Sequence, residues 1–130
     1  MTVNLAITRT DSRKPNAFST EEKKEWLASL EGRIAAEVLL LAPAEVKAIL
    51  DAEKDGSSVL LVNPPFDDIY ILWLCAMIDM ANGEYNKYGN TSQIYNDFYH
   101  DFVRWFINEY QPAQGHTKEE LLYVRKSERA

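Results

Sequence analysis

The sequence predicts an all-α protein: a small helical bundle of three to five helices, with a short extended segment near 59–62 and extended or weakly helical termini. Three observations favour this fold class. Apolar residues recur every three or four positions in two long stretches, which is the spacing of one helix face. A third stretch is apolar on almost every side, as in a helix at the centre of a bundle. The chain has only five glycines and five prolines, too few for a loop-rich β-sandwich.

The size and composition of the chain suit one domain. It has 130 residues, of which 46% are hydrophobic, so a core can form and disorder is not expected. We expect an N-terminal arm over 1–17, the helical bundle over 18–112 and a C-terminal tail over 113–130. The arm can be either a short helix or extended, and it lacks the basic and long apolar regions of a signal peptide.

The first long helix is predicted to begin at a capping box. The Ser19 hydroxyl can accept from the Glu22 amide, and the Glu22 side chain can reach back to Ser19. Pro43 is expected to stop this helix, because proline has no amide hydrogen and clashes with the preceding turn. One or two further turns can follow over 44–50. The apolar face of the first helix consists of Trp26, Leu27, Leu30, Ile34, Val38 and Leu41.

The segment 59–62 is a β-branched and leucine run that is long enough for a short strand. It follows a turn-rich linker over 51–58 and precedes Pro64 and Pro65, which favour extended backbone. No other part of the chain is an obvious strand partner, and an isolated strand has little stability. Two alternatives stay open: the segment packs as extended chain across the helices, or it pairs with another subunit.

The apolar run 69–78 predicts the central helix, with Asp67 as its N-cap. Either Asn82 with Gly83, or Gly89, ends this helix. The run is far shorter than the roughly 20 residues that cross a bilayer, so no membrane is expected as a partner. Cys75 is the single cysteine of the chain, and within this run we interpret it as a small buried hydrophobe rather than a reactive thiol.

The last long helix is expected to start at a new N-cap over 90–93 and to stop before Pro112. One of its faces carries Tyr95, Phe98, Phe102, Trp105 and Phe106.

More aromatic residues lie in and around this helix than one small core needs, and Tyr and Trp are favoured at protein interfaces. The C-terminal tail has a second capping box at Thr117, but its apolar residues are too few to fold alone, so we expect them to meet a neighbouring protein. The candidate protein-interface residues are therefore Tyr85, Tyr88, Tyr99, Tyr110, Leu121, Leu122, Tyr123 and Val124.

No pattern in the sequence predicts catalysis, and we expect a protein that is not an enzyme and uses no cofactor or metal. A glycine-rich phosphate loop is missing. Asp97, His100 and Asp101 share one helix face, but a di-metal bundle needs carboxylate–histidine motifs on several helices. We therefore interpret these three residues as a solvated polar face.

The net charge of −6 is unevenly distributed. The first 17 residues carry a net +2 and the last 18 a net +1, which leaves −9 for the residues between them. An acidic body argues against ordinary nucleic-acid binding, which needs cationic neutralisation of phosphates. Two interpretations remain open: the acidic surface repels DNA, or it only keeps the protein soluble.

Two stretches resemble a known family. The first is Lys14-Pro15-Asn16-Ala17-Phe18-Ser19, leading into Glu25-Trp26-Leu27-Ala28-Ser29-Leu30-Glu31-Gly32-Arg33-Ile34. The second is Pro65-Phe66-Asp67-Asp68-Ile69-Tyr70, then Ile78-Asp79-Met80-Ala81-Asn82-Gly83-Glu84-Tyr85 and Tyr88-Gly89-Asn90, with Phe98 and Trp105. Over about 14–112, the chain resembles the small head–tail connector, or adaptor, proteins of tailed bacteriophages and prophages of Gram-positive bacteria.

The resemblance implies a helical bundle that assembles with copies of itself into a ring, usually dodecameric, beneath the portal protein. The ring extends the channel, and double-stranded DNA passes through its lumen without specific binding. It also docks the downstream neck, stopper or tail-terminator protein. The resemblance implies no cofactor and no catalytic residue, and it places the protein at the head–tail junction of the virion after assembly in the host cytoplasm. We expect acidic residues, with Glu84 and Asp97 as candidates, to face the channel and repel DNA.

Two other functions are alternatives to this one. The first is a cytoplasmic helical adaptor or regulatory protein that binds a single protein partner. The second is a small metal-dependent bundle enzyme, which requires tightly bound metal.

Overall fold

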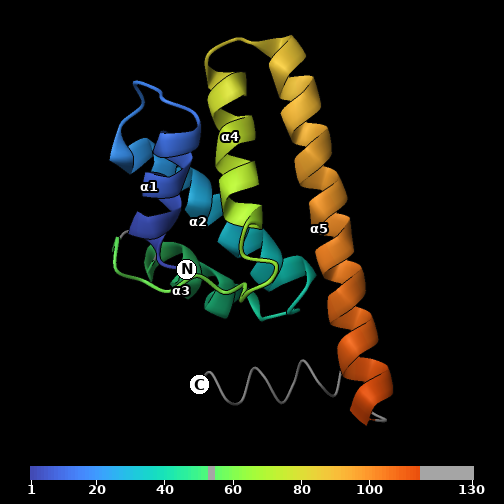
Figure 1. The fold of residues 1–130 in the computed structure, drawn as a ribbon. Coiled ribbons are helices and arrows are strands. Elements are labelled where there is room, and N and C mark those ends of the chain that lie inside the picture. The colour runs from blue at the N-terminus through green and yellow to red at the C-terminus, as the bar shows by residue number, and fades with distance from the viewer. Residues whose placement is uncertain (53–54, 115–130) are drawn as a thin grey trace.

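The computed structural model describes residues 1–52 and 55–114. Within these ranges the protein is built from five α-helices joined by turns and one extended segment (Figure 1). The predicted fold class, a small all-helical bundle, is therefore confirmed. The predicted C-terminal tail over 113–130 lies almost wholly outside the described residues.

Of the two forms expected for the N-terminal residues, the structure shows the helix: α1, Val3–Arg13. Thr2 caps the helix by accepting a hydrogen bond of 3.1 Å from the Leu5 amide. The apolar side chains of Val3, Ala6 and Ile7 lie on one face and are buried against the other helices. Helix α1 packs on α2 and α4 and contributes to the same core.

Helix α2, Thr20–Glu37, begins at the predicted cap. The Ser19 hydroxyl accepts a hydrogen bond of 3.1 Å from the Glu22 amide. The helix ends before its apolar face does: Leu40 adopts a left-handed backbone with φ of 52°, and the Leu41 amide turns back to the Ala35 carbonyl. Leu41 is buried all the same, so the apolar spacing predicted burial correctly and the helix length incorrectly.

Pro43 is the first residue of helix α3, Pro43–Ala52, and does not merely stop the preceding helix. Proline suits the first helical position, because the amide that it lacks has no partner within the helix there. The further turns expected over 44–50 are confirmed as part of α3. Helix α3 packs on α2.

The segment 59–62 is extended, as predicted, and its strand partner is the N-terminus of the same chain. Val59 forms an isolated antiparallel bridge with Thr2. The Leu60 amide donates to the Met1 carbonyl at 2.9 Å, and the Val3 amide donates to the Ser58 carbonyl at 3.0 Å. The N-terminus was not recognisable as a strand partner, because only Met1 and Thr2 precede α1.

Helix α4, Ile69–Ala81, is the central helix. Its N-cap is Asp68, one residue after the predicted Asp67. No side chain makes a capping hydrogen bond there. At the other end Asn82 caps the helix and Gly83 has a φ of 73°, so the first of the two predicted ends is correct. Within the described residues no helix is long and apolar enough to cross a membrane.

Helix α5, Tyr85–Gln114, is continuous over 30 residues, about 45 Å, and runs antiparallel to α4 (Figure 1). The predicted new N-cap over 90–93 is wrong, because the Thr91 hydroxyl bonds to the Lys87 carbonyl and to Asp79 and does not cap a helix. The helix also continues past Pro112, where it was predicted to stop, although a proline within a helix removes a backbone donor and crowds the preceding turn. Since α4 has 13 residues, the end of α5 reaches well beyond it (Figure 1).

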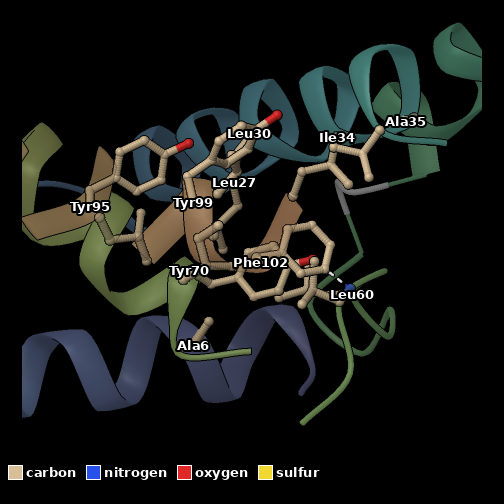
Figure 2. Packing of buried hydrophobic residues seen from close by; sticks show 14 of the residues in the cluster. Ala6, Leu27, Leu30, Ile34, Ala35, Leu60, Tyr70, Tyr95, Tyr99 and Phe102 are labelled. Atoms are coloured by element: carbon tan, nitrogen blue, oxygen red, sulfur yellow. Dashed lines mark hydrogen bonds between the residues drawn. The ribbon is translucent and has the colours of Figure 1, made fainter. Parts of the chain in front are cut away.

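The core lies where α1, α2 and α5 surround α4 (Figure 2). Tyr70 and Leu74 of α4 are fully buried, as are Leu27 and Leu30 of α2. From α5, the aromatic face contributes Tyr95, Tyr99, Phe102 and Phe106. Cys75 is buried on α4, and burial raises the pKa of its thiol, against the opposing effect of the nearby Lys14. The predicted role of Cys75 as a buried hydrophobe agrees with this placement.

Candidate functional site

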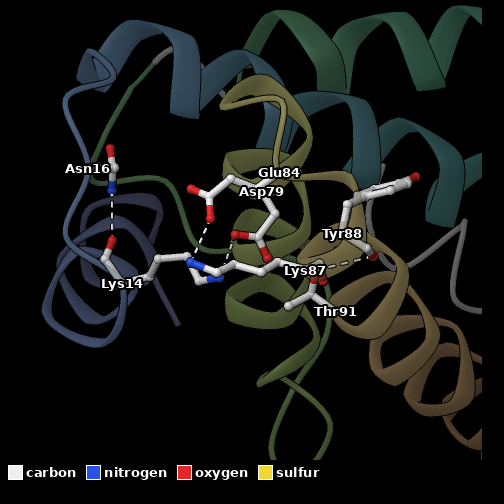
Figure 3. Close-up of polar contacts among 7 residues, drawn as sticks. All are labelled: Lys14, Asn16, Asp79, Glu84, Lys87, Tyr88 and Thr91. Atoms are coloured by element: carbon white, nitrogen blue, oxygen red, sulfur yellow. Dashed lines mark hydrogen bonds and ion pairs between the residues drawn. The ribbon is translucent and has the colours of Figure 1, made fainter.

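A buried carboxylate joins three segments near the tip of the α4–α5 hairpin (Figure 3). Asp79 of α4 is 1% exposed. Its Oδ1 lies 2.6 Å from the ammonium group of Lys14, in the loop after α1, and its Oδ2 accepts a hydrogen bond of 3.0 Å from the Thr91 hydroxyl of α5. We call these three residues the Asp79 junction. It holds the α1–α2 loop against both helices of the hairpin.

The loop that carries Lys14 is itself held by polar contacts. The Asn16 side chain donates to Asp11 at 2.9 Å and to the Lys14 carbonyl at 3.0 Å, and it accepts from the Phe18 amide at 3.1 Å. Asp11 also pairs at 2.7 Å with Lys23, whose side chain is buried. The loop between α1 and α2 therefore has a defined shape that points Lys14 at Asp79.

A second buried carboxylate, Glu31 of α2, fixes the extended segment 59–62. It is 1% exposed and accepts a hydrogen bond of 2.9 Å from the Leu61 amide and another from the Tyr70 hydroxyl. The Tyr70 hydroxyl in turn accepts from the Val62 amide at 2.8 Å. These contacts satisfy two backbone amides that would otherwise be buried without a partner, which is costly.

Tyr99, one of the predicted interface residues, is in the core and does not offer a free surface. Its hydroxyl donates to Glu37 at 2.9 Å, and the guanidinium of Arg33 lies 5.1 Å from its ring centre. Burial, and then the hydrogen bond to Glu37, raise the pKa of Tyr99 far above its usual value. Within one copy of the chain, Tyr99 therefore joins α5 to α2.

Tyr95, one turn earlier on α5, is buried without such a partner. Burial raises the pKa of Tyr95 to about 12, and its hydroxyl is the one buried side-chain polar atom in the described part of the chain that has no hydrogen-bond partner. Both tyrosines are thus buried on the same helix, but only the Tyr99 hydroxyl has a hydrogen-bond partner.

This contrast gives a matched pair of substitutions. We expect Tyr95→Phe to leave the free energy of unfolding unchanged or to raise it by about 1 kcal/mol, because it removes an unsatisfied buried hydroxyl. Tyr99→Phe should lower it by about 1 kcal/mol, because it removes a hydrogen bond to a carboxylate. Urea unfolding of both variants measures the difference, and a loss for Tyr95→Phe as large as that for Tyr99→Phe would contradict this account.

The other predicted interface residues divide into two groups. Tyr85 is 68% exposed and Tyr88 is half-buried, both in the first turn and a half of α5. Met80, at the end of α4, is 40% exposed near them in the sequence, so the hairpin tip carries accessible apolar surface. The side chain of Tyr110 and the tail residues Leu121, Leu122, Tyr123 and Val124 lie outside the described residues.

The two acids expected to face a channel lie at different places. Glu84 is in the turn between α4 and α5 and pairs with Lys87 at 2.6 Å. Asp97 lies in the middle of α5 and is exposed. The structure does not bring these two carboxylates together. Asp97, His100 and Asp101 also do not form a ligand set, since no group of three potential ligands suited to a metal ion occurs among the described residues.

An aromatic cluster covers the segment before α4. The ring of Phe66 lies within 5.1–5.8 Å, centre to centre, of Phe98, Phe102 and Trp105 of α5. Trp105 remains 37% exposed, beside a shallow pocket that Leu39 and Leu61 also line. The predicted aromatic face of α5 is therefore mostly core, with Trp105 at its edge.

The fold and these surfaces define a helical bundle whose polar interior contacts position segments of the chain. Its exposed large apolar residues lie on α1, after α2, in the segment 59–62, at the hairpin tip and on α5. Searches of protein-family models, curated proteins and solved structures gave no match for the chain.

Proposed function

We propose that the protein is a structural subunit of a tailed bacteriophage: a head–tail connector that forms a ring of copies beneath the portal protein, extends the DNA channel and docks the next neck or tail protein. In this proposal it acts by assembly, not by catalysis, and it belongs to the virion.

One observation carries the proposal: the two stretches that resemble connector proteins meet at the Asp79 junction. Lys14 comes from the first stretch and Asp79 from the second, 65 positions later, and they form an ion pair of 2.6 Å (Figure 3). Asn16 of the first stretch shapes the loop, and Gly83 of the second makes the left-handed turn of the hairpin. The resemblance thus rests on residues that build one structural feature, which supports a shared fold.

The long helix α5 gives the proposal a physical form. At about 45 Å it is the longest element of the described chain, and it separates two ends of the molecule. Tyr85 and Met80 are exposed near one end, while the other end reaches beyond the bundle (Figure 1). A subunit with two separated contact ends suits a ring that sits between two different neighbours.

The test is electron microscopy of lysates from a phage whose genome lacks the coding sequence for this chain. We expect heads that leak DNA or lack tails, beside free and complete tails, because the junction cannot form. Restoring the coding sequence from a plasmid should restore infectious particles, which serves as the control. Normal infectious particles from the deletion phage would overturn the connector function in favour of a helical adaptor that binds a single protein.

A further inference from the structure

Helix α1 presents a row of three exposed residues spaced four positions apart: Leu5, Arg9 and Arg13. Leu5 is 39% exposed and adds apolar surface to this row. Within residues 1–52 and 55–114, neither arginine has an ion-pair partner. We call these residues the α1 row. It offers one apolar contact followed by two unused positive charges.

Helix α5 presents a second row with the same spacing: Asp97, Asp101 and Trp105. Trp105 has the exposed apolar surface described above. Asp97 has no ion-pair partner in the described part of the chain, and Asp101 makes only a distant contact of 3.7 Å with the exposed Arg104. We call these residues the α5 row. It carries two negative charges followed by one apolar contact.

The two rows are complementary when they are placed side by side in opposite directions. Residues four apart in a helix are separated by about 6 Å, so both rows repeat with the same step. In the antiparallel register Leu5 faces Trp105, Arg9 faces Asp101 and Arg13 faces Asp97. Every apolar residue then meets an apolar residue, and every cation meets an anion.

One copy of the chain cannot make these contacts itself. Both α1 and α5 pack on α4, and in the described residues no Cα atom of α1 lies within 8 Å of a Cα atom of α5. They lie on different sides of α4 and run in opposite directions (Figure 1). They also overlap along the bundle, because Asp79 contacts both Lys14, directly after α1, and Thr91 of α5. A neighbouring copy set beside the first one therefore presents its α1 row antiparallel to the α5 row.

We propose that copies of this chain associate head to tail through the α1 row of one copy and the α5 row of the next. Two different surfaces are used, so the contact is heterologous, and repetition by a rotation that closes gives a ring. We call this contact between neighbouring copies the seam. That the copies close into a ring rests on the proposed connector function. It assigns Asp97 to the seam, which leaves Glu84 as the remaining candidate for the channel.

Cross-linking tests the seam directly. A Cys75→Ala background removes the single native thiol, and Leu5→Cys with Trp105→Cys places one thiol on each row. With a short bismaleimide, the purified full chain at high concentration should give a ladder of covalent multimers. The matched control, Leu5→Cys with Asn96→Cys, has its second thiol on an exposed position of α5 away from the row. The proposed seam would be contradicted if no covalent multimers formed, or if the control formed them in equal yield.

Charge exchange gives an independent readout in the same cross-linking background. We expect Asp97→Arg with Asp101→Arg to lower the ladder yield about tenfold or more, because like charges then face each other. Arg9→Asp with Arg13→Asp should do the same, and the chain that carries all four changes should recover the ladder. Failure of the combined chain to recover, with a normal thermal unfolding curve, would refute the pairing. A failed seam beside leaking heads in the deletion phage would leave the connector function standing.

Discussion

Replacing Glu31 by alanine is expected to lower the free energy of unfolding by about 3–5 kcal/mol. The Glu31 carboxylate is fully buried, and it accepts hydrogen bonds from the Leu61 amide and the Tyr70 hydroxyl. Without it, these donors stay buried with one partner fewer, and the segment 59–62 loses its attachment to α2. Urea unfolding followed by circular dichroism measures the loss, and the melting temperature should fall by about 10 °C or more.

Glu31→Gln is the matched control, because the glutamine side chain keeps the size and one carbonyl acceptor. We expect it to retain more than half of the stability that Glu31→Ala loses. Hydrogen exchange adds a local readout: the Leu61 and Val62 amides should lose protection in Glu31→Ala before those of α4 do, since both lie in the segment that Glu31 holds. Equal stability of the alanine variant and the wild type would contradict the assigned role.

Replacing Lys14 by alanine is expected to cost about 3 kcal/mol, because it leaves the Asp79 carboxylate buried without its cation. The two partners differ: the side chain of Asp79 is 2% exposed and that of Lys14 is 27% exposed. Asp79 is therefore the more desolvated partner, so losing its cation costs more than Lys14 would lose without Asp79. We expect Lys14→Ala combined with Asp79→Asn to be more stable than Lys14→Ala alone.

Arg104→Ala provides the comparison for an exposed pair. Its contact with Asp101 spans 3.7 Å between two largely exposed side chains, so its removal should change the stability by less than about 0.5 kcal/mol. Thermal and urea unfolding of the Lys14→Ala and Arg104→Ala variants measure which of them loses more stability. If Lys14→Ala were as mild as Arg104→Ala, the Asp79 junction would not hold the α1–α2 loop in solution.

Local sequence patterns predicted the elements whose signals are complete within a few residues. Ser19 and Glu22 predicted the start of α2, because a capping box spans only four consecutive residues. The continuous apolar run predicted the central position of α4, and Gly83 marked one of its two possible ends. Helical spacing likewise identified the buried faces of α2 and α5, because burial follows the period of the helix.

The burial of single aromatic residues could not be predicted from the sequence, because an aromatic residue has the same local signal in a core as on a surface. Tyr99 is buried where it contacts α2: its hydroxyl donates to Glu37, and the guanidinium of Arg33 lies over its ring. Both contacts depend on how α2 is placed relative to α5. Tyr85, with no such partner, is exposed. The α1 and α5 rows can be read from spacing, but their exposure follows only from the packing of both helices on α4.

The sequence by itself determined the all-helical class, the central helix, the cap at Ser19 and the extended backbone of 59–62. Only the tertiary structure decided that α1 belongs to the core, that residues 1–3 pair with 58–60, and that α5 runs unbroken past Thr91. The physical reason is the same in each case. These features depend on partners far away in the chain, such as Asp79 for Lys14 and Thr91, and no local pattern specifies which distant group satisfies a given side chain or amide.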